Sequence, residues 1–234
     1  MKKELIEPFF ATLRAANPLP ASELEFTAPF ELLVAVLLSA QATDVGVNKA
    51  TRKLFPVANT PQAILDLGPE RLEDYIKTIG LYRAKARHLM ATCRILVDRY
   101  GGEVPRTREE LESLPGVGRK TAACIQIFSW GIPEIPVDVH VHRVGGRLGL
   151  FRPNASFEEA HDEMLAITDG DDAYELHMNL IRHGRMVCRP QPRCQECALR
   201  RLCPWWRENR APGSGAAEGG SGARSTARKA GAGR

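Results

Sequence analysis

No apolar run in this sequence is long enough to cross a lipid bilayer. The longest, residues 32–38, has seven residues, whereas a membrane-spanning helix needs about 20. The N-terminal stretch MKKELIEPFF also lacks the apolar core and cleavage site of a signal peptide. We therefore expect a soluble cytoplasmic protein. Internal repeats and β-rich segments are missing too, and an apolar content of 44% over 234 residues is enough for one large or two small domains.

A large net charge is also missing, because 32 basic and 28 acidic residues leave only +4. The charge is unevenly distributed: residues 182–210 carry +6, residues 211–234 carry +3, and residues 1–181 carry −5. A basic C-terminal region on an acidic body is typical of a protein that contacts a polyanion along one face. Residues 211–234 contain no aromatic or large aliphatic side chain, so we expect a disordered basic tail there.

Apolar residues recur at helical spacing in the first half of the chain. A first helix should end near residues 17–20, and a second, entered at Thr27 and Pro29, is apolar on nearly all sides and is expected in the core. A polar cluster in SAQATD follows it. Thr43 can cap the next helix there, which is as good an interpretation of this cluster as a binding role. The face of the first helix is formed by Ile6, Phe9, Phe10 and Leu13.

Further helices are predicted between residues 60 and 101. One opens at Thr60 and closes at Gly68, a second closes at Gly80, and a third ends at Gly101. The apolar stripe of the third includes Cys93, which we therefore expect in the core, as we do Cys124 in the segment TAACIQIF. The other members of the stripe are Ala86, Leu89, Met90, Leu96, Val97 and Tyr100.

The segment LPGVGRK, residues 114–120, predicts a turn that binds phosphate. Thr107 and Glu110 form a capping pair for a short helix before it. Two glycines around Val117 allow a sharp turn with free backbone N–H groups beside the start of the next helix, near Arg119. Such a site binds a phosphate without reading a base. A tight link in a helical hairpin without a ligand explains the glycines equally well.

Lys120 favours the functional interpretation of this turn. The helix dipole and the neighbouring Arg119 both disfavour an ammonium, so they favour the neutral amine that attacks carbon. A partner must return from the far end of the helix, about 16 Å away. The Gly/Pro-rich segment GIPEIPVD can span about 20 Å when extended, so Asp138 can lie near Lys120.

The segment VDVHVH, residues 137–142, alternates apolar and polar residues, and this pattern alone predicts a strand. His140 and His142 are candidate metal ligands. Two histidines without a matching carboxylate or cysteine pair are more often ordinary polar residues. Ser156 and Glu159 form a second capping box, and Asp171 or Asp172 is expected to open a later helix.

Four cysteines within sixteen residues can surround one metal centre: Cys188, Cys194, Cys197 and Cys203. Both tetrahedral Zn²⁺ and a [4Fe–4S] cluster accept four thiolates. Structural zinc usually takes two close cysteine pairs, and only Cys194 and Cys197 are close here, so the spacing favours iron–sulfur over zinc without excluding zinc.

LPGVGRK, the following helix, the Gly/Pro loop and VDVH resemble the helix-hairpin-helix DNA glycosylase superfamily, and the four cysteines narrow this resemblance to the endonuclease III family. It covers about residues 1–205. It implies that Lys120 is the nucleophile, that Asp138 is its partner and the cap of a helix through about Leu148, and that the cysteines hold a [4Fe–4S] cluster. Adenine-removing and thymine-mismatch relatives carry another residue at the position of Lys120.

The resemblance also implies DNA contacts. Gln41 would occupy the space vacated in the duplex, and Leu81, exposed in a turn before Tyr82, would wedge between bases. Backbone and side-chain contacts would come from Gly116, Val117, Gly118, Arg119 and Arg193. The sequence departs from the family at the first cysteine loop, RPQPR, which is one residue shorter, at Val139 and at Asn179. The shorter loop bears on the DNA contacts made there, and Val139 and Asn179 bear on substrate preference or rate.

The implied architecture is all-α with two domains and a DNA cleft between them. A helical barrel would span residues 22–132, with the hairpin at about 108–130, and residues 1–21 and 133–210 would form an iron–sulfur cluster domain. The implied function is a monomeric, nucleoid-associated base excision repair enzyme that removes oxidised pyrimidines and cleaves the abasic strand. Two other classes stay open. A protein that only binds DNA would need neither Lys120 nor Asp138, and a redox sensor built on the cluster would respond to oxidant without needing a lesion.

Overall fold

The computed structural model describes residues 6–18 and 20–209. Within these residues every regular element is a helix and no strand occurs, so the all-α prediction is confirmed for them. None of the described helices combines the length and apolarity needed to cross a membrane. The predicted basic tail, residues 211–234, lies outside the described residues.

The described helices range in length from short 3₁₀ turns to the long α6. In chain order they are α1 (Ile6–Ala16), α2 (Pro29–Ser39), α3 (Asp44–Leu54), α4 (Pro61–Leu67), α5 (Pro69–Ile76), α6 (Tyr82–Tyr100), α7 (Arg108–Glu112), α8 (Arg119–Trp130), α9 (Val139–Leu148), α10 (Phe157–Ile167), η2 (Gly170–Asp172), α11 (Ala173–Met186), η3 (Cys194–Glu196) and α12 (Pro204–Asn209).

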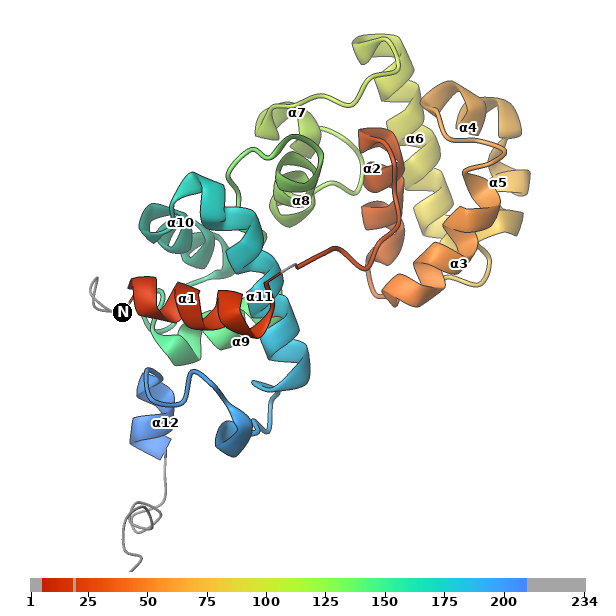
Figure 1. Cartoon of the computed structure of the whole chain (residues 1–234). Coiled ribbons are helices and arrows are strands. Elements are labelled where there is room, and N and C mark those ends of the chain that lie inside the picture. Colours follow the sequence, from red (N-terminus) through yellow and green to blue (C-terminus); the bar gives the residue numbers. More distant parts are fainter. Residues whose placement is uncertain (1–5, 19, 210–234) are drawn as a thin grey trace, which may run out of the picture.

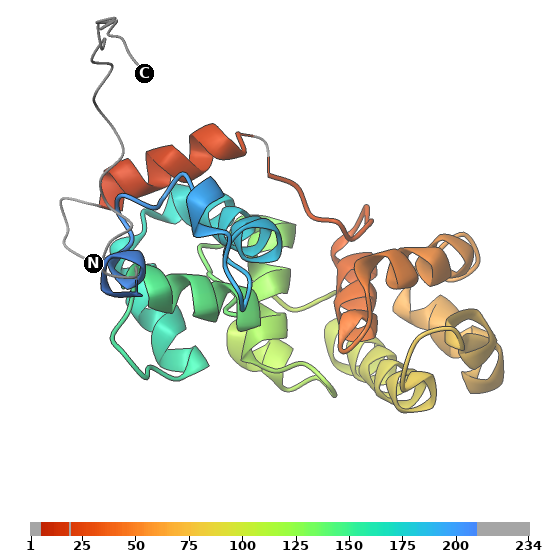
Figure 2. The same ribbon diagram turned by 90° about the horizontal axis from the view of Figure 1, so that it is seen from below.

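The helices pack around two separate apolar cores. The larger core is formed by α2 to α7 with one face of α8, and the second by α1 with α9 to α11. Figure 1 shows the two groups side by side, and in Figure 2 the segment from α1 to α2 crosses between them. Helix α8 contributes to both cores, with Ala122 and Ile125 in the first and Ile127 in the second. Helix α8 is therefore packed into both cores.

Helix α2 is the centre of the larger core, as its composition predicts. It packs against α3, α6 and α8, and Leu33, Val34 and Leu38 are fully buried. At its C-terminal end the buried Lys85 of α6 donates from Nζ to the carbonyl of Leu38 at 2.9 Å. This bond satisfies a helix carbonyl that would otherwise be unpaired, and it fixes the end of α2 to the start of α6.

Most predicted helix ends are confirmed, but one is wrong. Helix α5 ends at Ile76 and not at Gly80. The amide of Ile79 donates to the carbonyl of Ile76 at 2.8 Å, which closes a tight turn before the glycine is reached. The alternative interpretation of SAQATD as a helix end is confirmed, because the Thr43 side chain accepts from the amide of Gly46 and caps α3.

Helix α9 begins at Val139 and ends at Leu148, so the helix that the family resemblance implies is confirmed and the strand that the alternation of residues 137–142 predicts is wrong. Asp138 is the N-cap of α9, and its side chain accepts from the amides of His140 and Val141. The capping box of Ser156 is confirmed. The Thr107 side chain caps α7 from one side only. Asp172 precedes α11 without a side-chain cap bond.

Candidate active site

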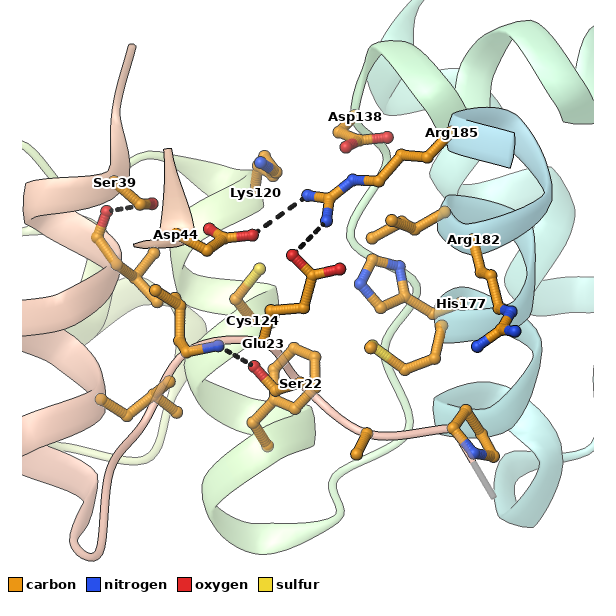
Figure 3. Close-up of a pocket in the computed structure, with 18 of the residues that line it drawn as sticks. Ser22, Glu23, Ser39, Asp44, Lys120, Cys124, Asp138, His177, Arg182 and Arg185 are labelled. Atoms are coloured by element: carbon orange, nitrogen blue, oxygen red, sulfur yellow. Dashed lines mark hydrogen bonds and ion pairs between the residues drawn. The ribbon is translucent and has the colours of Figure 1, made fainter. Parts of the chain in front are cut away.

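A cleft of about 500 Å³ lies between the two cores. Side chains one helical turn apart form its walls: Lys120, Cys124 and Phe128 on α8, and His177, Ile181 and Arg185 on α11. Helix α2, the first residue of α3, the linker between α1 and α2, and Asp138 also contribute to the lining. Figure 3 shows side chains from these segments pointing into one shared space.

Lys120 lies in the first turn of α8, at one end of this cleft. The preceding turn is built on Gly116, whose φ of +81° lies in the left-handed region that glycine adopts without strain. Gly118 is the N-cap of α8 and provides no side-chain cap, so the first amides of the helix are open to a ligand. One expectation needs correction: Val117 is buried, and its amide donates to the carbonyl of Leu114 at 3.0 Å, so it is not free.

Asp138 lines the same end of the cleft as Lys120 (Figure 3). Its Oδ1 accepts from the amides of His140 and Val141, both at 2.8 Å, which fixes the carboxylate at the start of α9. The extended segment before Asp138, residues 132–137, is called the strap below. His161 holds it, because its Nδ1 is 2.8 Å from the carbonyl of Ile135. The sequence prediction that Asp138 can return to Lys120 is therefore consistent with the fold, and its chemical role remains a prediction.

Arg185 forms an ion-pair link across the cleft that sequence patterns did not indicate. Its guanidinium binds Glu23 of the linker at 2.8 Å and Asp44 of α3 at 3.2 Å (Figure 3). Arg185 belongs to the second core's helix α11, whereas Asp44 begins a helix of the first core. The link therefore joins the two halves of the molecule at the mouth of the candidate site.

Gln41 and Leu81 lie in neighbouring turns. With Asn154 they are the only non-glycine residues of the described chain with positive φ, at 55° for Gln41 and 59° for Leu81. A Cβ atom added at Gly80 would lie 3.9 Å from the carbonyl oxygen of Gln41, so the two turns are close. Leu81 is 64% exposed. Backbone conformations of this kind gather at functional sites, but the roles of both residues remain predictions.

Two buried titratable side chains, Cys124 and His177, also line the cleft. Burial raises the pKa of the Cys124 thiol to about 11, so it is an inert core residue, in line with the sequence prediction. Burial lowers the pKa of His177 to about 4, so its imidazole is neutral near pH 7. No sequence signal distinguishes His177 from the other histidines.

Replacing His177 with Gln should make the folded protein less sensitive to acid. The folded pKa is about 4 and the unfolded value 6.5, so below pH 6.5 the unfolded chain binds a proton that the folded protein does not. Between pH 7.5 and pH 5, the free energy of unfolding of the wild-type protein should therefore fall by about 2 kcal/mol more than that of His177→Gln. Urea unfolding of both proteins at pH 7.5 and pH 5 measures it, and equal losses would contradict the expectation. Groups common to both proteins cancel.

The four cysteines of the C-terminal region line one cavity with Arg147 and His183. Arg147 donates from Nη1 toward Cys188 Sγ at 3.4 Å, and its guanidinium lies 4.7 Å from the ring centroid of Trp205. In the described chain, no three His, Cys, Asp or Glu side chains are close enough to hold a single metal ion. A four-iron cluster binds each cysteine at a different iron, so it suits a wider set of thiols.

The remaining predicted ligands and contacts have ordinary surroundings. His142 Nε2 lies 2.8 Å from the carbonyl of Ala155, and His140 Nδ1 contacts Arg143 at 3.1 Å, which supports the interpretation of both as ordinary polar residues. Arg119 pairs with Asp162. Arg193 is half exposed, lines the cysteine cavity and lies 3.8 Å from Glu196.

A family model described as HhH-GPD superfamily base excision DNA repair protein matches residues 34–168. The chain is 51% identical over 194 residues to the Endonuclease III of Escherichia coli K12, which covers 82% of this chain and 92% of that protein. It is 50% identical to the Endonuclease III of Haemophilus influenzae Rd over the same shares of the two chains.

Among solved structures, the chain matches a trapped Endonuclease III–DNA covalent intermediate in an estranged-adenine complex. The TM-score is 0.83 at 42% identity, and the match covers 89% of this chain and 98% of that one. The arrangement of helices around the cleft is therefore shared with a protein whose solved structure contains DNA.

Proposed function

We propose that this chain, which belongs to the HhH-GPD superfamily of base excision DNA repair proteins, removes oxidised pyrimidine bases from duplex DNA and cleaves the resulting abasic strand, with Lys120 as its nucleophile. The likeness to the endonuclease III family predicted from the sequence is confirmed. The observation that supports the proposal is that Lys120 and Asp138 line the same cleft (Figure 3).

The proposed chemistry starts with a base turned out of the duplex, because the glycosidic carbon is inaccessible in the stack. The lone pair of the Lys120 amine attacks the sugar carbon C1′, and the base leaves with the glycosidic electrons and takes up a proton. The adduct opens to a Schiff base. Its positive charge acidifies the proton on C2′, and loss of that proton expels the 3′ phosphate.

Asp138 has two proposed tasks in these steps. The amides of His140 and Val141 hold Oδ1, so Oδ2 remains available to the reacting sugar. A fixed carboxylate stabilises the positive charge that develops on the sugar during base loss. It also assists removal of a proton from the Lys120 amine before attack.

The turn between α7 and α8 is the proposed grip on the DNA backbone. The free first-turn amides and the positive end of the α8 dipole favour a phosphate oxygen at Gly118 and Arg119. Because these donors belong to the backbone, they bind without base identity. We further propose that Gln41 fills the space left by the base, that Leu81 wedges into the stack and that Arg193 contacts a phosphate.

Gly116→Ala is expected to weaken binding to undamaged duplex about tenfold. Its φ is +81°, and a Cβ would lie 3.2 Å from both His88 Nδ1 and Leu37 Cδ2, so the turn must shift and the amides lose their direction. Fluorescence anisotropy measures the affinity. Gly102→Ala is the matched control, because its φ is +86° and no atom lies within 4 Å of its Cβ position. Similar losses of affinity in both variants would contradict a specific role of the hairpin.

The four cysteines are the proposed ligands of a [4Fe–4S] cluster: Cys188, Cys194, Cys197 and Cys203. Their shared cavity and the Arg147 N–H directed at Cys188 suit a group with anionic sulfur. When bound, the cluster would supply a rigid link between the loop after α11 and α12. Arg193, next to Cys194, would then be held in a constant position.

We propose that the two apolar cores correspond to two domains, residues 22–132 and residues 1–21 with 133–210, and that the protein acts as a monomer on DNA that contains a damaged base or an abasic site. A protein that only binds such DNA is the second candidate. Borohydride reduction during the reaction separates the two. It should trap the Schiff base as a covalent protein–DNA adduct, and a binding protein would give none.

A further inference from the structure

His177 is a buried, titratable side chain that the proposed mechanism does not use. It is 2% exposed, yet its ring reaches the cleft near Lys120 and Asp138 (Figure 3). It lies on α11 one turn before Ile181 and two turns before Arg185. A polar ring in this position either supports the fold or contacts whatever enters the cleft.

The two nitrogens of the His177 ring have different surroundings. Nδ1 is buried without a hydrogen-bond partner among the described residues. The backbone carbonyl of Pro136, in the strap that leads to Asp138, raises the pKa of the ring and so favours its protonated form. Nε2 is absent from the buried unpaired atoms of the described chain, so it is open to the cleft. A neutral imidazole has one N–H and one lone pair, so Nε2, the nitrogen that is open to the cleft, can accept a hydrogen bond from a group bound there.

Several neighbours of the His177 ring in the cleft are apolar or already paired. Phe128 meets the ring edge-on, with centroids 5.9 Å apart, and Ile181 adds a further apolar side chain. The carboxylates of Glu23 and Asp44 are both bound to Arg185. Burial lowers the pKa of His177 to about 4. The charge of Asp138 raises this pKa and the charge of Lys120 lowers it, and both effects are smaller than that of burial. The ring therefore enters any complex as a neutral acceptor.

We propose that His177 recognises the extruded base, with Nε2 accepting a hydrogen bond from an N–H group on the base's Watson–Crick edge. This inference rests on the proposed function. A flipped base is commonly read along that edge, and every pyrimidine has a donor there: the imide N–H of a thymine-derived lesion or the amino group of a cytosine-derived one. A buried acceptor that stays unpaired in a complex costs free energy, so bases that lack the donor are disfavoured.

The test compares His177→Gln with His177→Asn. The oxygen of Gln can reach the position of Nε2, whereas the shorter Asn places its oxygen near the position of Nδ1. Both variants are polar, so differences between them report the position of the acceptor. Single-turnover release of dihydrothymine should stay within about threefold in His177→Gln and fall about tenfold to hundredfold in His177→Asn. Cleavage of a preformed abasic site, which has no base to recognise, should change less than twofold in both.

A modified substrate tests the same hydrogen bond by removing its donor. N3-methyl dihydrothymine lacks the imide donor, so wild-type protein should release it about tenfold or more slowly than dihydrothymine. His177→Asn should show no such preference, because the acceptor is already lost. Abasic-site cleavage also reports that each variant is folded.

The proposal is overturned if His177→Asn releases dihydrothymine as fast as wild type. It is also overturned if His177→Asn slows abasic cleavage as much as it slows base release, because His177 would then act in the same step as Lys120. It is also overturned if the methyl group slows His177→Asn as much as wild type. Wild-type protein that fails to cleave abasic DNA would instead remove the proposed function, so the two failures are distinguishable.

Discussion

Lys120→Gln is expected to abolish strand cleavage while leaving duplex binding nearly intact. Gln keeps most of the length of the side chain but has no basic amine, so no Schiff base forms and the single-turnover rate should fall on the order of 10³-fold or more. Affinity for abasic-analogue DNA should stay within about threefold, because the backbone amides at the start of α8 hold the phosphate. Nicking assays, borohydride trapping and anisotropy measure the three quantities.

Lys49→Gln is the matched control for this variant. Lys49 is an exposed lysine of α3 that does not line the cleft, so its replacement removes one positive charge without touching the proposed nucleophile. It should lower affinity slightly through the loss of general attraction and leave the saturated cleavage rate unchanged. Undiminished nicking by Lys120→Gln would remove the assigned nucleophile, and a trapped adduct in that variant would point to another amine.

The second large effect is expected at the four cysteines. Purified wild-type protein should be brown and contain about four irons per chain, and Cys197→Ala should lose most of this iron. Because binding of a structural metal group contributes to folding, the variant should unfold about 10 °C or more below wild type. Iron analysis, visible absorbance and thermal unfolding measured by circular dichroism measure these changes.

Cys93→Ala separates loss of a ligand from loss of a buried thiol. Cys93 is fully buried in the larger core and lies far from the cysteine loops in the sequence. This control should keep its iron and lose only the roughly 1 kcal/mol of a small core truncation. Stoichiometric zinc without iron in protein purified anaerobically would overturn the assignment of the cluster.

Features that depend on neighbours along the chain could be predicted well. The glycines of PGVG predicted the turn before α8, and Thr43 and Ser156 cap the helices that follow them, because each cap bond spans three residues. The alternation in residues 137–142 shows the limit of such patterns. It predicted a strand, and only the family resemblance indicated the helix that the Asp138 cap begins.

Two local expectations failed because residue type does not show which backbone groups pair within a turn. Gly80 is a reasonable helix terminator, yet α5 ends earlier because the amide of Ile79 turns back to Ile76. Val117 looked like a donor for phosphate, but packing buries it and Leu114 takes its amide. In both cases the backbone bonds of the folded chain compete with the role that residue type suggests.

The sequence predicted the helical architecture through its resemblance to the DNA glycosylase superfamily. Spacing and residue type by themselves determined that Lys120, Asp138 and the four cysteines are candidate site residues. Only the tertiary structure decided that Arg185 meets Asp44, 141 residues away in the chain, and that a neutral His177 faces the cleft. Both residues lie where α11 packs against the strap and the linker. The ion pairs of Arg185 and the burial of His177 therefore depend on segments that are far apart in the sequence, and no local pattern connects them.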